Sequence, residues 1–217
     1  MTKRVISVFL CVLCVISSIS FIVSAKENKE YTSDNFLSVA DGIIAWKKAD
    51  NGSEPDGYLI NDKYLENAGT TPGDWYPIAL GRLGIQDNNE GYLAVIKDRV
   101  EERYRESGRL SAAKATEWHR IALAVLAMGG DPTNFGTDEN GAPINLIADG
   151  TYDRGKTTPL GRQGINGWIW GLITLDSMRY TVPDGAYNTR DDIIVEIISK
   201  QLSDGGFALS SDDADPD

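Results

Sequence analysis

The sequence is poor in the side chains that most metal sites and nucleophilic sites require. It contains one histidine, His119, and two cysteines, Cys11 and Cys14, which both lie in an apolar N-terminal segment. Structural zinc sites need several cysteine or histidine ligands, and the rest of the chain does not offer them. A Ser-His-Asp triad would have to use His119, and no Gly-x-Ser-x-Gly segment accompanies it. We therefore expect the protein to use no cofactor.

Basic residues are also few, with 21 Lys and Arg against 32 Asp and Glu and a formal net charge of −11. The nucleic-acid backbone is normally bound by clustered Lys and Arg, so we expect no nucleic-acid partner. There is only one long apolar stretch, which excludes a multi-pass membrane protein. The remaining composition, 41% hydrophobic and 24% charged, is that of a globular protein long enough to bury a core.

The one long apolar stretch has the pattern of a secretory signal peptide. Lys3 and Arg4 precede an apolar run over residues 5–23, and the small residues Ser24 and Ala25 stand before a polar segment. This order of basic, apolar and small residues predicts cleavage after Ala25 and a secreted or cell-surface protein. An uncleaved membrane anchor is the alternative, because the run is almost long enough to span a bilayer.

Two kinds of apolar segment alternate along the remaining residues, 26–217. The first kind has apolar residues at helical spacing with charged residues between them, which predicts helices that bury one face. These segments are Asp34–Lys48, Glu90–Glu106 and Arg190–Leu202. Residues 144–148 could add a short helix of the same kind.

The second kind of segment is apolar nearly all round after its first residues. These segments are Trp75–Leu83, Trp118–Met128 and Ile165–Leu175. In a soluble protein this pattern predicts helices enclosed by other helices. The tripeptide Ile-Ala-Leu occurs at 78–80 and again at 121–123, each time three residues after a tryptophan, and this self-similarity indicates a helical-hairpin repeat. The alternation of outer and inner helices favours two concentric rings over an open solenoid.

Gln201-Leu202-Ser203-Asp204-Gly205-Gly206-Phe207 is similar to the Gln-x-x-x-Gly-x-Trp repeat of squalene and terpene cyclases, with Phe in the Trp position. Together with the alternating helices, it resembles the α/α-toroid of those cyclases, of protein prenyltransferase β subunits and of transcobalamin and intrinsic factor. The chain is most similar to exported bacterial proteins with prenyltransferase/squalene-oxidase repeats, in which surface-attachment modules often follow. The resemblance implies an all-α fold, in which residues 26–217 are the N-terminal portion of an incomplete six-hairpin toroid.

The acidic C-terminal segment offers the nearest match to the family's chemistry. Squalene-type cyclisation needs a strong general acid in an Asp-x-Asp-Asp motif, and Asp213-Ala214-Asp215-Pro216 departs from it by a proline at the last position. The alternative is an acidic turn that caps a following helix. Asp213, Asp215 and Asp217 also alternate as in calcium-binding loops, but the glycine and glutamate of such loops are missing.

The remaining candidate site is aromatic. In a closed toroid the first turns of the inner helices lie around one rim, where aromatic and polar side chains could bind an isoprenoid, a corrin or a sugar ring. The candidate rim residues are Asp74, Trp75, Tyr76, Glu117, Trp118, His119, Asn166, Trp168 and Trp170. The alternative is that these rings pack between inner and outer helices.

The sequence thus predicts a secreted or surface-attached binding module for a small apolar or ring-shaped ligand, or for a protein partner, without its own catalysis. Two alternatives remain open. One is a terpene cyclase/mutase-like enzyme, or another α/α-barrel lyase or hydrolase, whose catalytic half lies beyond residue 217; paired carboxylates such as Asp74 and Glu117 would suit glycoside hydrolysis. The other alternative is a structural spacer at the cell surface.

Overall fold

The computed structural model describes residues 33–154 and 158–209. Within these ranges the chain is helical and contains no β-strand, which confirms the predicted all-α class. The chain divides into two compact units, with the boundary between Ala45 and Trp46 inside helix α2 (Ser33–Asn51). In the first unit only residues 33–45 of α2 are described; the predicted helix is present, and Phe36, Val39 and Ile43 of its apolar stripe are exposed.

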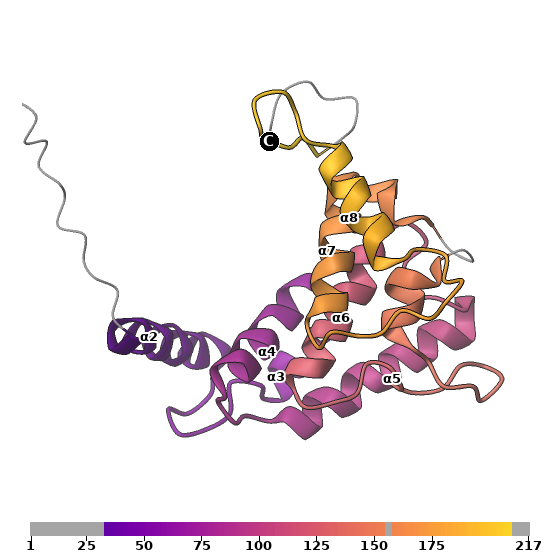
Figure 1. The fold of residues 1–217 in the computed structure, drawn as a ribbon. Coiled ribbons are helices and arrows are strands. Elements are labelled where there is room, and N and C mark those ends of the chain that lie inside the picture. Colours follow the sequence, from indigo (N-terminus) through magenta and orange to yellow (C-terminus); the bar gives the residue numbers. More distant parts are fainter. Residues whose placement is uncertain (1–32, 155–157, 210–217) are drawn as a thin grey trace, which may run out of the picture. The chain divides into compact units, whose positions relative to one another are not determined.

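The second unit contains the repeat. After the short helix α3 (Asp62–Leu65) come α4 (Thr71–Leu83), α5 (Asn89–Ser107) and α6 (Ala115–Ala127). A 3-10 helix (Leu160–Gln163) then precedes α7 (Ile165–Asp176) and α8 (Arg190–Ser199). The three predicted inner segments correspond to α4, α6 and α7, and the outer segments to α5 and α8. Figure 1 shows α4, α6 and α7 side by side, with α5 along them and α8 beside α7.

The inner helices α4 and α6 are parallel. Asp74 of α4 pairs with Arg120 of α6, and seven residues further along both helices Gly81 lies against the backbone of Ala127. A Cβ atom at Gly81 would lie 2.0 Å from the Ala127 carbonyl oxygen, so only glycine permits this approach. Because the two contacts occur in the same order along α4 and along α6, the two helices run in the same direction.

Helix α7 continues the same layer, and it is parallel to α6. Gln163, just before α7, accepts a hydrogen bond from the backbone N–H of Thr116 in the first turn of α6. Further along both helices, a Cβ atom at Gly171 would lie in van der Waals range of the His119 ring. Gly167 in the first turn of α7 packs on the Leu160 carbonyl, where a Cβ would clash.

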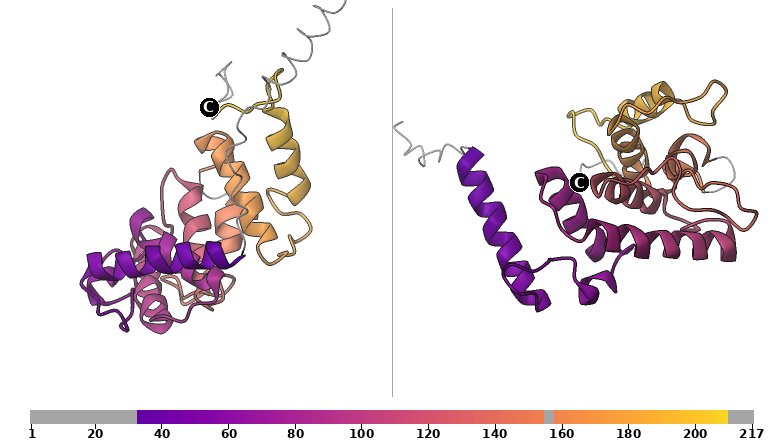
Figure 2. Two further views of the ribbon diagram at one scale, coloured as in Figure 1. Left: turned by 90° about the vertical axis from the view of Figure 1, so that its left-hand side faces the viewer. Right: turned by 90° about the horizontal axis from the view of Figure 1, so that it is seen from below.

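The outer helices run antiparallel to the inner ones. At the start of α5, Asn89 donates to the carbonyl of Met128 at the end of α6, and at the end of α5 the Tyr104 hydroxyl meets the Trp118 indole near the start of α6. Helix α5 buries a stripe of residues four apart, which includes Tyr92, Ile96 and Val100. The two further views in Figure 2 show α8 lying along α7.

Local sequence signals set the helix ends. Asn88 caps α5 by accepting from the Gly91 N–H, and Gly108 ends it at φ +64°. Thr189 and Asp192 form a reciprocal capping box at the start of α8. Proline at position 77 of α4 leaves the carbonyl of Gly73 without its helical donor, and the buried Tyr64 hydroxyl donates to that carbonyl instead, at 3.0 Å.

Three details differ from the sequence-based expectation. Of the short helix expected over residues 144–148, residues 144 and 145 are not helical; the helix begins at residue 146 and continues into a π-helix, Ala148–Tyr152. Helix α8 ends at Ser199, because Gln201 to Phe207 form a turn in which the Gln201 side chain donates to the Gly205 carbonyl. The inner layer is also not enclosed on all sides: in the second unit Ile173 is 43% exposed, and Leu123 and Leu126 are only half-buried.

Candidate functional site

The predicted rim residue Asp74 lies in the interior. Its side chain is fully buried and accepts three hydrogen bonds: from the Gly69 N–H at 2.7 Å, the Tyr92 hydroxyl at 2.8 Å and Arg120 Nε at 2.8 Å. Burial raises the pKa of Asp74, and the hydrogen bonds from Arg120, Tyr92 and Gly69 oppose that rise. The carboxylate thus joins α4, α5 and α6 at one point.

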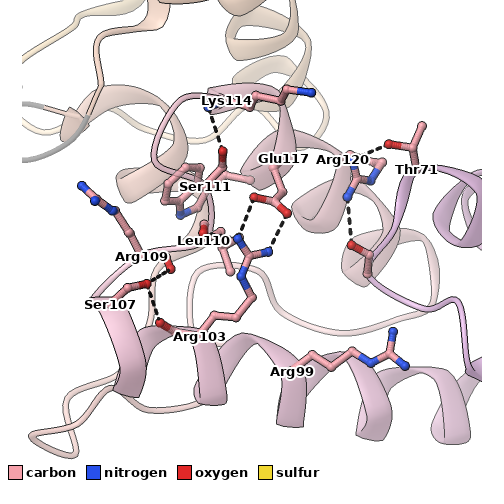
Figure 3. Close-up of polar contacts among 12 residues, drawn as sticks. Thr71, Arg99, Arg103, Ser107, Arg109, Leu110, Ser111, Lys114, Glu117 and Arg120 are labelled. Atoms are coloured by element: carbon pink, nitrogen blue, oxygen red, sulfur yellow. Dashed lines mark hydrogen bonds and ion pairs between the residues drawn. The ribbon is translucent and has the colours of Figure 1, made fainter.

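Glu117 is occupied in a similar way, as Figure 3 shows. Its carboxylate accepts from both terminal nitrogens of Arg103 on α5, at 2.5 and 3.1 Å. Arg103 also donates to the Leu110 carbonyl. Nearby, Arg120 reaches Thr71 at 3.2 Å, and Arg99 donates to three carbonyls at the end of α3. The charged groups on this side of α5 and α6 are therefore used to hold loops and helices together.

Trp118 packs between an inner and an outer helix. It is fully buried, and its Nε1–H donates to the Tyr104 hydroxyl at 2.8 Å, while Tyr104 donates to Asp149 at 2.7 Å. The Arg154 guanidinium lies 4.6 Å from the centre of the indole ring, within cation–π range. Burial raises the pKa of the Tyr104 hydroxyl, so this group stays protonated. Trp118 therefore packs between helices, which was the alternative to a place in a ligand-binding rim.

His119 is fully buried, and one of its ring nitrogens has a partner. Nε2 lies 2.8 Å from the Gly150 carbonyl oxygen, and because a carbonyl can only accept, the imidazole carries its proton there. Nδ1 has no hydrogen-bond partner among the residues described. Burial lowers the pKa of His119 to about 3, so the ring is neutral at physiological pH.

Three other predicted rim residues have different environments and do not form one site. Tyr76 is half-buried and meets the Tyr64 ring edge-on, with ring centres 6.4 Å apart. Asn166 is exposed. Trp168 is half-buried against Gly161, and its indole N–H finds no acceptor in the described parts of the chain.

Trp75 and Trp170 are the two predicted residues that the fold brings together. Their ring centres lie 5.6 Å apart with the planes tilted by 52°, and Trp75 is 41% exposed. Both rings line a groove of about 970 Å³ along α4, α6 and α7, which we call the inner groove. Its remaining lining residues are Ile78, Gly81, Arg82, Leu123, Leu126, Ala127, Leu172, Ile173, Asp176, Ser177 and Met178.

The inner groove is apolar over most of its length, and its size falls in the range of small-molecule sites. The predicted rim included Trp75 and Trp170 but not the lining beyond the first turns of the helices. The sequence did contain a signal for the missed lining residues. The segments that form α4, α6 and α7 each carry apolar residues on more sides than their neighbours cover. Only the parallel arrangement of the three helices shows which of these sides remain open.

The acidic C-terminal residues Asp213, Asp215 and Asp217, predicted as weak acid or calcium candidates, lie outside the described residues. Over residues 33–154 and 158–209, no group of three or more His, Cys, Asp or Glu side chains is placed to hold a metal ion. None of the helices in those ranges is both long enough and apolar enough to cross a bilayer.

Comparison with known proteins adds no relative. No protein-family model, curated protein or solved structure matches this chain.

Proposed function

We propose that this protein is a secreted or cell-surface binding module that holds an apolar ligand in the inner groove. Its helices would form part of an α/α-toroid like that of exported bacterial proteins with prenyltransferase/squalene-oxidase repeats. Parallel inner helices, with antiparallel outer helices packed against them, support this architecture. The observation that carries the proposed function is an exposed apolar groove of about 970 Å³ with two tryptophan rings in contact at its side.

The state of the polar groups favours binding over catalysis by the described residues. Acid–base chemistry needs a titratable group that can reach substrate. Asp74 is fully buried in an ion pair with Arg120, Glu117 is tied to Arg103, and His119 is neutral and buried against Gly150. Large apolar surface, in contrast, is rarely left exposed on a monomer unless it serves an interaction.

The proposal can be tested with N-phenyl-1-naphthylamine, a neutral apolar dye whose emission rises on leaving water. We expect saturable binding to the full chain, accompanied by a change in tryptophan emission from Trp75 and Trp170. Ile173→Asn should weaken binding about tenfold, because the removed apolar contact is worth roughly 1–2 kcal/mol.

Val195→Asn is the matched control. Val195 is 64% exposed on α8 and does not line the inner groove. The substitution Val195→Asn also replaces an exposed apolar side chain by an amide, but outside the groove, so its effect on binding should be small. Absence of saturable binding, or equal weakening by the two variants with both still folded by circular dichroism, would refute the proposed function.

A further inference from the structure

One end of the inner groove is bordered by arginines. Asp176, the last residue of α7, lines the inner groove and also a neighbouring hollow of about 410 Å³. The other residues of that hollow are Arg179, Tyr180 and Arg190, while Arg82 in the last turn of α4 lines the groove itself. Arg190 and Arg179 therefore flank the Asp176 carboxylate, and Arg82 adds a third guanidinium group to the groove lining.

The parallel direction of the inner helices places this charged end away from the tryptophan pair. Arg82 is seven residues beyond Trp75 on α4, and Asp176 is six residues beyond Trp170 on α7. At the rise of an α-helix these separations correspond to about 10 Å. The groove therefore runs from two aromatic rings, over Leu123, Leu126 and Ile173, to an end that carries arginine side chains.

One of the three arginines at this end forms an ion pair within the described residues. Asp176 is neutralised by Arg190, which donates from Nε at 2.8 Å and from a terminal nitrogen at 2.9 Å. Arg82 and Arg179 have no carboxylate within ion-pair distance in the described chain. Asp191 also acts on Arg190, and Asp131 acts on Tyr180, so acidic groups are present at this end as well. Arg82 and Arg179 still present guanidinium groups that no ion pair holds, and such groups can bind an anion.

Arg179 occupies an unusual backbone position. Its φ is +53°, and it is the one residue other than glycine with positive φ among those described. It closes the turn after α7, in which the Tyr180 N–H donates to the Leu175 carbonyl at 2.9 Å. Such turns normally take glycine, which adopts this conformation without strain. The backbone is therefore strained at Arg179, and this residue places its guanidinium group beside the groove.

We propose that the inner groove binds an amphiphile with an anionic head, a carboxylate or a phosphate monoester, at Arg82 and Arg179. The apolar chain would lie along α4, α6 and α7 and end at Trp75 and Trp170. This inference rests on the proposed function, because it names the class of ligand for the same groove. Guanidinium groups suit both heads, since their paired N–H donors match carboxylate and phosphate oxygens.

The test compares ligands that share a ten-carbon chain and differ in the head: decanol, decanoate, decyl phosphate and decyltrimethylammonium. Each is titrated against N-phenyl-1-naphthylamine bound to the full chain, below its micelle concentration and at pH 7.5. We expect the two anions to displace the dye at concentrations about tenfold lower than decanol, and the cation to be the weakest. The advantage of the anions should shrink as salt is added.

Variants identify the head-binding residues. Arg82→Gln and Arg179→Gln should each reduce the preference for decanoate over decanol about threefold and leave decanol unchanged. Arg105→Gln is the control, because it removes the same charge from an exposed position on α5 that lies outside the groove. An equal effect of Arg105→Gln would show that the preference depends on net charge alone and would overturn the assignment.

The outcomes separate the two proposals. If decanol and the anions bind equally, the head-binding site is wrong and the apolar groove stands. If no member of the series displaces the dye, or if the chain self-associates through the groove in sedimentation and thereby excludes the dye, both proposals fail. The ratio of decanoate to decyl phosphate affinity assigns the head chemistry.

Discussion

Mild acid should destabilise this protein through its one histidine side chain. His119 is the only histidine in the sequence, it is fully buried, and burial lowers its pKa to about 3. In the unfolded chain the same imidazole has a pKa near 6.5. Between these two values the unfolded state binds a proton that the folded state does not. The stability that comes from neutral His119 is therefore fully present above pH 6.5 and is lost as the pH falls toward 3.

The size of the effect follows from the two pKa values. Each pH unit between them lowers the free energy of unfolding by about 1.4 kcal/mol. A change from pH 7 to pH 5 should therefore cost about 2 kcal/mol from this residue alone. Natural domains have roughly 5–15 kcal/mol of total stability, so a loss of this size is readily measured.

Urea denaturation of the full chain at pH 7, 6 and 5, followed by circular dichroism, measures the loss. His119→Gln provides the control, because its amide can still donate to the Gly150 carbonyl but does not titrate. The pH dependence of the variant should be shallower by about 2 kcal/mol over this interval. The NMR signals of the one imidazole give an independent test: a titration midpoint near 6.5 in the folded protein would refute the reasoning.

Three further predictions follow from the same structure. Asp74→Ala leaves Arg120, whose side chain is only 13% exposed, without its carboxylate and should cost about 3–5 kcal/mol in urea denaturation. Asp176→Ala breaks an exposed pair and should cost less than about 1 kcal/mol; equal losses would contradict the assigned burial. Arg179→Gly removes strain at φ +53° and should raise stability by about 1 kcal/mol while it weakens decanoate binding; a lower melting temperature would show that the turn is not strained. Gly81→Ala forces a Cβ against the backbone of α6 and should cost at least about 1–3 kcal/mol, and a neutral result by thermal denaturation would show that the two helices are further apart than described.

Hydropathy periodicity was sufficient to locate the long helices, because it depends on neighbours along one helix, but it missed the four-residue helix α3 (Asp62–Leu65). The outer helix α5 was predicted over Glu90–Glu106 and is observed over Asn89–Ser107, and the inner helix α7 was predicted over Ile165–Leu175 and is observed over Ile165–Asp176. The region after α6 was harder, because its π-helix Ala148–Tyr152 depends on tertiary hydrogen bonds such as that between Gly150 and His119.

The same periodicity could not tell which side of each inner helix is covered. Trp75 and Trp118 occupy equivalent places in the repeat, and the sequence treats them alike. In the folded chain Trp118 is fully buried against Tyr104, whereas Trp75 is 41% exposed and touches Trp170. The difference arises because Tyr104, fourteen residues before Trp118, places a hydroxyl at that indole, whereas Trp75 meets an open groove.

What the sequence alone determined is therefore the class of helices and their alternation, since both depend on the 3.6-residue period and on caps formed within a few residues. The tertiary structure decided which polar and aromatic groups are buried in packing contacts and which stay accessible to a ligand. Parallel packing of α4 and α6 buries Asp74 against Arg120 and leaves Arg82 at the groove, although both residues lie on one helix. Contacts between residues that are 14 to 46 positions apart make that choice, and no local pattern encodes them.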